Sequence, residues 1–177
     1  MLIALLGVRG SGKSTIANYL VDNYKFTSLS FAEKLKQVVS IAFDINLELL
    51  EGNSLESRVY RETQNEFWGM TPRQMLETVG TKLFRKGISE DFWVKIVEMK
   101  IINLLNNGEN VVISDLRFMN EWEMLKKYNV KVVFVDNGKQ IDNEYEIGSI
   151  QYDIKIENKG ITKEELYKEI ETKIITF

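Results

Sequence analysis

The 177-residue sequence contains no cysteine and no histidine. The lack of cysteine excludes disulfide bonds and thiol catalysis, and it agrees with a cytoplasmic location. The lack of histidine removes the commonest general base and metal ligand. Any acid–base chemistry must therefore use carboxylates or groups of the substrate itself.

Long hydrophobic runs and a strong net charge are absent as well. No apolar stretch is long enough to span a bilayer, and the run at residues 2–6 lacks the basic flank of a signal peptide. The net charge of −3 argues against a surface that coats nucleic acid. We therefore expect a globular protein that binds neither a nucleic-acid polymer nor a membrane, and we leave open whether it forms a homodimer.

Near its N-terminus the chain fully matches the phosphate-binding pattern GxxxxGK[ST], at residues 7–14, GVRGSGKS. This loop binds phosphate only when a buried strand precedes it and a helix follows it. Residues 2–6, LIALL, are wholly apolar, and apolar residues recur at helical spacing over residues 16–24. Because both flanks are present, we expect this phosphate loop to bind a nucleoside triphosphate.

Each residue type in the phosphate loop has a physical role. The glycines let backbone N–H groups turn inward, and the N-terminus of the following helix adds a positive dipole end. Lys13 would reach the β- and γ-phosphates, and the Ser14 hydroxyl would ligate Mg²⁺. The cofactor-binding residues that we predict are Gly7, Gly10, Ser11, Gly12, Lys13, Ser14 and Thr15.

Strand and helix patterns alternate along the rest of the chain. Apolar residues predict further strands at 26–31, 110–115, 130–135 and 152–156. Short helical turns are expected near Leu47 and Leu55, and the polar span 51–69 predicts a partly mobile insert. Residues 136–150 predict a loop with a helical turn near Tyr145. The alternation predicts a three-layer α/β/α P-loop NTPase domain with a five-stranded parallel sheet.

A second local signal marks the start of a helix at residues 71–74, TPRQ. Thr71 can cap the helix, Pro72 suits its first position, and Gln74 completes a capping box. Arg73 is then placed unfavourably, because a cation in the first turn opposes the helix dipole. An anion bound beside Arg73 would resolve this conflict, and a solvated arginine without a partner is the alternative.

An acid and an arginine end the apolar strand expected at 110–115. Asp115 completes the run VVISD, which has the form of a Walker B element that holds Mg²⁺ or its waters beside a phosphate loop. Arg117 would lie at the same edge of the sheet, where an arginine can neutralise charge on the transferring phosphoryl group. The alternative for Arg117 is a structural ion pair with Asp115 or Glu121.

The order of several sequence blocks, spread over most of the chain, resembles that in phage-type deoxynucleoside monophosphate kinases. These enzymes are P-loop kinases similar to other nucleoside monophosphate kinases. The blocks are GVRGSGKST, SFAEKLK, MTPRQMLETVGTKLFR, DFWV, VVISDLRFMNE and IENKG. The resemblance implies transfer of the γ-phosphoryl group of ATP to a deoxynucleoside 5′-monophosphate, with ATP and Mg²⁺ as cofactors. It also implies one kinase domain over residues 1–177 with a helical acceptor-binding insert at about 31–107. Lys34 and Met119 stand where such enzymes often carry proline.

The resemblance assigns roles to individual positions. The acceptor-binding residues that it implies are Phe31, Lys36, Arg73, Arg85, Trp93 and Arg117. No arginine follows residue 117, so a separate arginine-rich lid after the fourth strand is not expected, and Arg9 becomes a candidate for covering the phosphates. The catalytic residues that we predict are Lys13, Arg117, Asp115 and Arg9.

The predicted mechanism is mainly electrostatic, because cations can hold two phosphates in line and screen the charge as it shifts. A monophosphate acceptor is already a competent nucleophile at neutral pH, so the lack of histidine is no obstacle. Another small-molecule kinase of the phosphomevalonate kinase type and a nucleotide-binding module without turnover remain alternatives. A regulatory GTPase is not expected, because residues 115–118, DLRF, lack the glycine of DxxG and residues 158–161, NKGI, lack the aspartate of NKxD.

Overall fold

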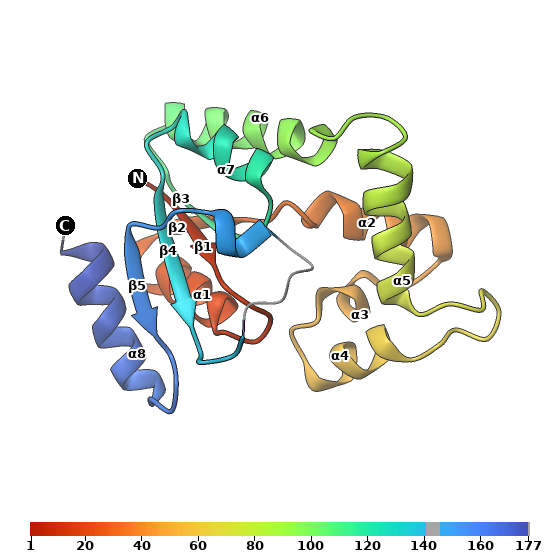
Figure 1. The fold of residues 1–177 in the computed structure, drawn as a ribbon, viewed down its shortest axis with the longest axis horizontal. Helices are drawn as coiled ribbons and strands as arrows, with labels where there is room; N and C mark the ends of the chain where they lie inside the picture. The colour runs from red at the N-terminus through yellow and green to blue at the C-terminus, as the bar shows by residue number, and fades with distance from the viewer. Residues whose placement is uncertain (141–145, 177) are drawn as a thin grey trace. The chain divides into compact units, whose positions relative to one another are not determined.

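The computed structural model of the protein describes residues 1–140 and 146–176 (Figure 1). The chain forms two compact units, one made of Met1–Ser30 with Ile96–Phe177 and the other of Phe31–Lys95. We call the first the sheet unit and the second the helical unit. The boundary between them falls within one helix, α6 (Phe92–Asn106).

The sheet unit is built on five parallel strands in the order β2-β3-β1-β4-β5 (Figure 1). The strands are β1 (Leu2–Leu6), β2 (Phe26–Leu29), β3 (Asn110–Leu116), β4 (Lys131–Asp136) and β5 (Ile154–Glu157). All five residues of β1 are buried, as its wholly apolar sequence requires for a central strand covered on both faces. The expected five-stranded parallel α/β fold is therefore confirmed.

Helices cover both faces of this sheet. On one face lie α1 (Lys13–Tyr24) and α8 (Lys163–Ile170) (Figure 1). Helix α8 continues as the π-helical turn η3 (Glu171–Ile175). Helices α6 and α7 (Met119–Lys126) lie on the other face (Figure 1). Apolar residues of α1 and α8 pack against the strands in one core. Its members include Ile3, Leu5, Ile16, Leu20, Val133, Val135, Ile156, Leu166 and Ile170.

A short 3₁₀ turn, η2 (Glu146–Ser149), completes the sheet unit. It lies in the segment 136–150 for which a loop with a helical turn was expected, although Tyr145 itself lies outside the described residues. The boundaries of the other elements differ slightly from the expected ones: β2 ends at Leu29, two residues early, and β3 extends one residue beyond Asp115.

The helical unit contains a core of its own, with Val39, Leu50 and Met75 among its buried residues. Its helices are α2 (Glu33–Phe43), α3 (Leu47–Glu51), α4 (Leu55–Glu62), α5 (Pro72–Glu77) and the π-helical segment η1 (Thr78–Arg85). The capping box expected at Thr71 is confirmed, because the N–H of Gln74 donates to the Thr71 hydroxyl and the N–H of Thr71 donates to the Gln74 amide oxygen.

Helix α4 is longer than the short turn that we expected near Leu55. The N–H of Ser57 donates to the Ser54 hydroxyl, and the N–H of Ser54 donates to the Ser57 hydroxyl. The two serines thus form a capping box in which serine replaces the usual Glu or Gln at the third helical position. Because serine at this position is not part of the usual capping-box pattern, the sequence analysis did not predict the start of this helix.

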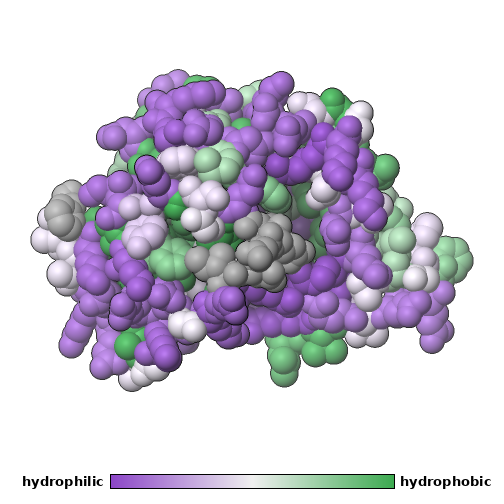
Figure 2. Space-filling model, viewed as in Figure 1, coloured by the Kyte–Doolittle hydropathy of each residue, from purple (hydrophilic) through white to green (hydrophobic). Residues whose placement is uncertain are grey.

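Hydrophilic residues make up most of the face shown in Figure 2, and apolar residues appear on it in small separate groups. The most exposed large apolar side chains belong to the helical unit, with Phe67 at 86% and Ile41 at 84% exposure. None of the helices in the described part of the chain has the length and apolar character needed to cross a membrane.

Candidate active site

The phosphate loop connects the end of β1 to the start of α1, as its sequence predicts. Gly7 and Gly12 have φ angles of +148° and +105°, which residues with a side chain rarely adopt. A Cβ atom on Gly7 would also lie 2.5 Å from the carbonyl oxygen of Val135 in β4. Backbone conformation therefore favours glycine at both positions, and at Gly7 the neighbouring strand leaves no room for a side chain.

Lys13 is buried within the phosphate loop, with an exposed fraction of 9%. Its Nζ donates to the carbonyl oxygens of Gly7 (2.6 Å) and Val8 (2.8 Å), and it lies 3.4 Å from the hydroxyl of Ser11. Burial lowers the pKa of Lys13 to about 8. The loop thus holds a cation at the place where the β- and γ-phosphates of a nucleotide would bind.

The charges of Arg117 and Asp115 act on Lys13. The positive charge of Arg117 adds to the lowering of the Lys13 pKa, and the negative charge of Asp115 opposes it. The structure therefore brings these three predicted catalytic residues close enough to interact. Arg9 lies exposed in the same loop, the exposed Ser14 lies in the first turn of α1, and Thr15 follows it half-buried.

Asp115 lies at an irregular point of β3. Ala4 of β1 pairs with Ile113 while Leu6 pairs with Leu116, so two steps along β1 match three along β3. Such a bulge bends the strand and redirects its side chains. Here the hydroxyl of Ser30, just beyond β2, donates to the Asp115 carboxylate over 2.7 Å. The bulge and this hydrogen bond together fix the orientation of the acid.

Glu121 organises the turn that carries Arg117. Its side chain is only 1% exposed, and one carboxylate oxygen accepts hydrogen bonds from the backbone N–H groups of Arg117 (2.9 Å) and Phe118 (3.1 Å). A carboxylate at the start of α7 also suits the positive end of the helix dipole. Glu121 therefore acts on the backbone that positions Arg117, a role that the sequence analysis considered only as an ion pair.

Met119 departs from the family pattern in a way that the structure explains. Its backbone N–H donates to the carboxylate of Glu146, in η2, over 2.6 Å. Proline has no N–H group and could not make this bond. The residue that replaces proline in this chain thus ties η2 to the start of α7, two residues after Arg117.

Two asparagines contact the phosphate loop, and the sequence analysis assigned a role to neither. The side-chain amide of Asn137, after β4, donates to the carbonyl oxygen of Gly10 (3.2 Å), and that of Asn158, after β5, donates to the carbonyl oxygen of Ser11 (2.8 Å). Asn158 was noted only within the IENKG block of the family pattern and in the comparison with the NKxD motif of GTPases. The two loops are far from the phosphate loop in sequence, so only the order of strands could have suggested these contacts.

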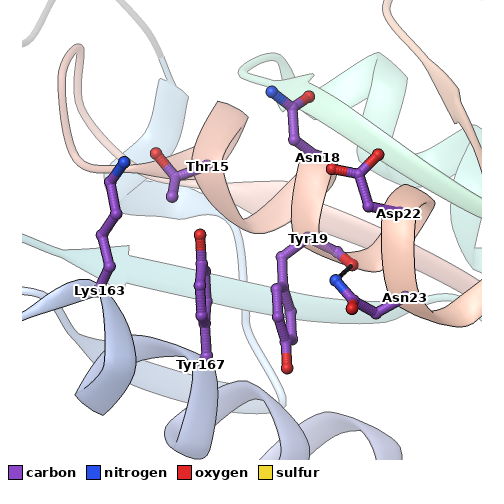
Figure 3. Close-up of a pocket in the computed structure, with 7 residues that line it drawn as sticks. All are labelled: Thr15, Asn18, Tyr19, Asp22, Asn23, Lys163 and Tyr167. Carbon is purple, nitrogen blue, oxygen red and sulfur yellow. Dashed lines mark hydrogen bonds between the residues drawn. The ribbon is translucent and has the colours of Figure 1, made fainter.

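A polar hollow of about 440 Å³ lies between α1 and α8 (Figure 3). Figure 3 shows Thr15, next to the phosphate loop, across from Lys163 and Tyr167 of α8. The rings of Tyr19 and Tyr167 stack on each other with centroids 4.0 Å apart. Because these two ring faces already contact each other, the hollow offers mainly hydrogen-bonding groups. It is lined by Thr15, Asn18, Tyr19, Asp22, Asn23, Lys163 and Tyr167.

Two of the cations implied for acceptor binding form ion pairs inside the helical unit. Nε of Arg73 donates to the Glu62 carboxylate of α4 over 2.6 Å, and Nζ of Lys36 donates to the Glu51 carboxylate of α3 over 2.6 Å. The alternative of an Arg73 side chain without a partner is therefore wrong. Arg85 lies half-buried at the end of η1. The binding of an acceptor phosphate by these cations stays a prediction.

The aromatic residues implied for acceptor binding are largely buried. Phe31 is 5% and Trp93 is 3% exposed. The indole N–H of Trp93 donates to the carbonyl oxygen of Gly80 in η1 over 3.0 Å, and its ring packs against Phe84 and Phe92 with centroid distances of 4.9 Å. Trp93 therefore stabilises the helical unit, and its contact with a substrate stays a prediction.

Comparison with known proteins finds related kinases. A profile of the family described as deoxynucleotide monophosphate kinase matches residues 46–170. A protein of Acanthamoeba polyphaga mimivirus named for the same activity is 34% identical over 186 residues, which cover 96% of this chain and 94% of the relative. The deoxynucleoside-5′-monophosphate kinase of Escherichia phage T5 is 40% identical over 60 residues, which cover 34% of this chain and 23% of that protein.

The fold is also found among solved structures. Dephospho-CoA kinase from Campylobacter jejuni superimposes with a TM-score of 0.56 at 12% sequence identity, covering 99% of this chain and 98% of that chain. At this level of identity the likeness concerns the fold alone.

Proposed function

The chain belongs to the deoxynucleotide monophosphate kinase family, and on that basis we propose that it transfers the γ-phosphoryl group of ATP to a deoxynucleoside 5′-monophosphate, producing ADP and a deoxynucleoside diphosphate. The observation that carries the proposal is the buried Lys13 ammonium inside a complete phosphate loop, within reach of the charges of Asp115 and Arg117. Besides ATP, the reaction then needs a small phosphorylated acceptor as its second substrate.

The donor side of the proposed site is the phosphate loop with α1. The backbone N–H groups of the loop and the N-terminus of α1 would bind the β- and γ-phosphates, because both present positive partial charge. Lys13 would pair with these phosphates through its three N–H donors. Burial favours this interaction, since charges attract more strongly where water is excluded.

Ser14 and Asp115 would hold Mg²⁺ in this proposal. One hydroxyl and one carboxylate suit this ion, which commonly binds through one or two protein oxygens and completes its shell with water and substrate phosphate. Among residues 1–140 and 146–176, no three Asp or Glu side chains gather into a metal-binding cluster. When bound, the ion would supply positive charge that offsets the negative charge of the ATP phosphates.

The acceptor-binding residues in this proposal, apart from Arg117, belong to the helical unit. Arg73 lies in the first turn of α5, where the positive end of the helix dipole favours an anion. Its carboxylate partner, Glu62, is about half exposed, so a phosphate that carries two charges can compete for the guanidinium. Lys36, Arg85 and the aromatic Phe31 and Trp93 complete the proposed acceptor set.

The proposed reaction forms one P–O bond and breaks another. An oxygen of the acceptor monophosphate attacks the γ-phosphorus, and the bond to the oxygen that bridges the β- and γ-phosphorus breaks, leaving that electron pair on ADP. The acceptor phosphate carries the attacking charge at neutral pH, so no general base is required. Lys13 and Arg117 would stabilise the charge on the transferring group, and Arg9 would cover it from the loop.

The test is a coupled assay of ADP release with ATP and Mg²⁺, run with each deoxynucleoside and ribonucleoside monophosphate in turn. ADP release that depends on a deoxynucleoside monophosphate supports the proposal and also measures the preference for base and sugar. A Lys13→Ala variant serves as the control for contaminating kinases, because it should release no ADP above background.

Two outcomes would overturn the proposal. ADP release without any acceptor would indicate an ATPase, and ATP binding without transfer to any monophosphate would indicate a binding module or a kinase for another small molecule. Direct detection of the deoxynucleoside diphosphate by chromatography separates phosphoryl transfer from simple hydrolysis.

A further inference from the structure

Two asparagines outside the phosphate loop hold two consecutive peptide groups within it. The amide of Asn137 binds the carbonyl oxygen of Gly10, and the amide of Asn158 binds the carbonyl oxygen of Ser11. Because Asn137 follows β4 and Asn158 follows β5, the loop is anchored to the ends of two neighbouring strands. The shorter of the two bonds, 2.8 Å, belongs to Asn158.

The contact of Asn158 orients an N–H group as well as a carbonyl group. In a planar trans peptide, the N–H of Gly12 points in the direction opposite to the carbonyl of Ser11. A donor that fixes this carbonyl therefore directs the Gly12 N–H away from Asn158. Backbone N–H groups of this loop are the donors that bind phosphate oxygens.

The position of Asn158 is itself fixed. Its backbone N–H donates to the carbonyl oxygen of Asp136 over 2.7 Å, which continues the pairing of β5 with β4. The space beside Gly12 is also filled, because a Cβ atom on Gly12 would overlap the amide nitrogen of Asn158. The sheet thus presents the amide rigidly against the phosphate loop, and the amide contributes a donor without adding a charge.

We propose that Asn158 is a positioning residue for phosphoryl transfer: its amide fixes the Ser11–Gly12 peptide group so that the loop binds the phosphates of ATP in the reactive geometry. This inference rests on the proposed function, since it takes ATP as the phosphoryl donor. The bond from Asn137 is longer and more exposed, so Asn137 has the smaller effect on the same loop.

The experiment compares Asn158→Ala and Asn158→Asp in the full chain with Asn103→Ala, a control at an exposed position of α6. Calorimetric binding of ATP gives the affinity without any acceptor, and steady-state kinetics give KM for ATP and for the monophosphate separately. We expect Asn158→Ala to weaken ATP binding about tenfold, the effect of one lost hydrogen bond, while KM for the monophosphate changes by less than about twofold. Asn158→Asp should bind ATP more weakly still, because its carboxylate faces a carbonyl oxygen and adds a negative charge beside the phosphates.

Unchanged ATP affinity in Asn158→Ala, or an equal rise of both KM values, would overturn the inference. Circular dichroism and thermal unfolding show whether the variant folds; if it does not, Asn158→Gln keeps the amide but displaces it by one methylene. Weaker ATP binding by a folded Asn158→Gln supports the positioning role, and wild-type binding contradicts it. Because ATP binding is measured without an acceptor, a wrong acceptor assignment would leave this test valid, so the two failures are distinguishable.

Discussion

The ammonium group of Lys13 donates to the carbonyl oxygen of Gly7 over 2.6 Å, so the lysine is hydrogen-bonded to the loop that it is expected to serve. It also bonds to the carbonyl of Val8, and water reaches little of it. The charge is therefore held in position by backbone oxygens rather than extended into solvent. A bound phosphate would share or displace these acceptors, which makes the protonation state of Lys13 important for binding.

The affinity for ATP should fall as the pH rises through about 8. Burial, assisted by the charge of Arg117, lowers the pKa of Lys13 to about 8, so the ammonium loses its charge in the free protein above that pH. Calorimetric titration with ATP at a series of pH values measures the effect. Arg117→Ala should move the fall to higher pH, because it removes a like charge, and Asp115→Asn should move it to lower pH. An ATP affinity that is constant from about pH 7 to about pH 9.5 would contradict this prediction.

Arg117→Ala should abolish phosphoryl transfer without unfolding the protein. The backbone N–H of Arg117 donates to Glu121, so the alanine variant keeps that bond. An arginine that stabilises the transferring phosphoryl group contributes about 10³-fold or more to kcat. The measurement is kcat together with the melting temperature, and Arg117→Lys separates charge from geometry. Normal turnover in a folded Arg117→Ala variant would show that this arginine takes no part in transfer.

Arg73→Ala and Glu62→Gln should change acceptor binding in opposite directions. The alanine variant loses the proposed phosphate ligand, and we expect KM for the monophosphate to rise about tenfold with KM for ATP nearly unchanged. The glutamine variant removes the carboxylate that now binds Arg73, so KM for the monophosphate should fall. If the ion pair only stabilises the helical unit, both variants should instead be less stable than the wild type, and in both variants KM should rise for the monophosphate and for ATP.

Gly7→Ala should destabilise the protein more than Gly10→Ala does. Both residues have positive φ angles, so both variants have a conformational cost of about 1 kcal/mol. Only at Gly7 would the new methyl group also meet the backbone of Val135, which adds about 2 kcal/mol of overpacking, whereas nothing lies within 4 Å of a Cβ at Gly10. Urea unfolding of the two variants measures the difference. An equal loss of stability in the two variants would contradict the prediction and would mean that β4 shifts to make room for the methyl group at residue 7.

Glu121→Ala should lower stability by about 2 kcal/mol and reduce kcat as well. The substitution leaves two backbone N–H groups, those of Arg117 and Phe118, without their buried acceptor. Glu121→Gln keeps an acceptor oxygen in the same place and should recover much of both losses. Chemical unfolding and the coupled assay provide the two readouts. A stable Glu121→Ala variant with normal kcat would show that this carboxylate is not needed to position Arg117.

The parts of the fold that the sequence predicts are those that local patterns determine. The apolar β1, the phosphate loop and the Thr71 capping box each depend on residues within a few positions of one another, and the structure contains all three. The start of α4 is equally local, but serine at the third helical position differs from the usual pattern. The π-helical segment η1 has no clear local signal, since it continues α5 without a break.

The parts of the site that the sequence does not predict depend on contacts between distant segments. Asn158 and Ser11 lie at opposite ends of the sequence, and only the pairing of β5 with β4 and of β4 with β1 brings them together. The partner of Arg73 could not be predicted either, because Glu62 belongs to a helix whose extent was underestimated. Residue types indicate the chemistry of this site, whereas the topology of the sheet selects which side chains support it.

The topology also has a consequence for how the chain assembles during synthesis. The helical unit is one continuous segment, so it can begin to fold as soon as its residues leave the ribosome. The central strand β1 is synthesised before this unit, whereas its partners β3 and β4 are synthesised after it. Pairing β1 with these strands therefore closes a long loop of the chain, which has an entropic cost. The phosphate loop gains its last anchor only when Asn158 follows β5. We therefore expect nascent chains to reach the full affinity for ATP only after β5 has emerged.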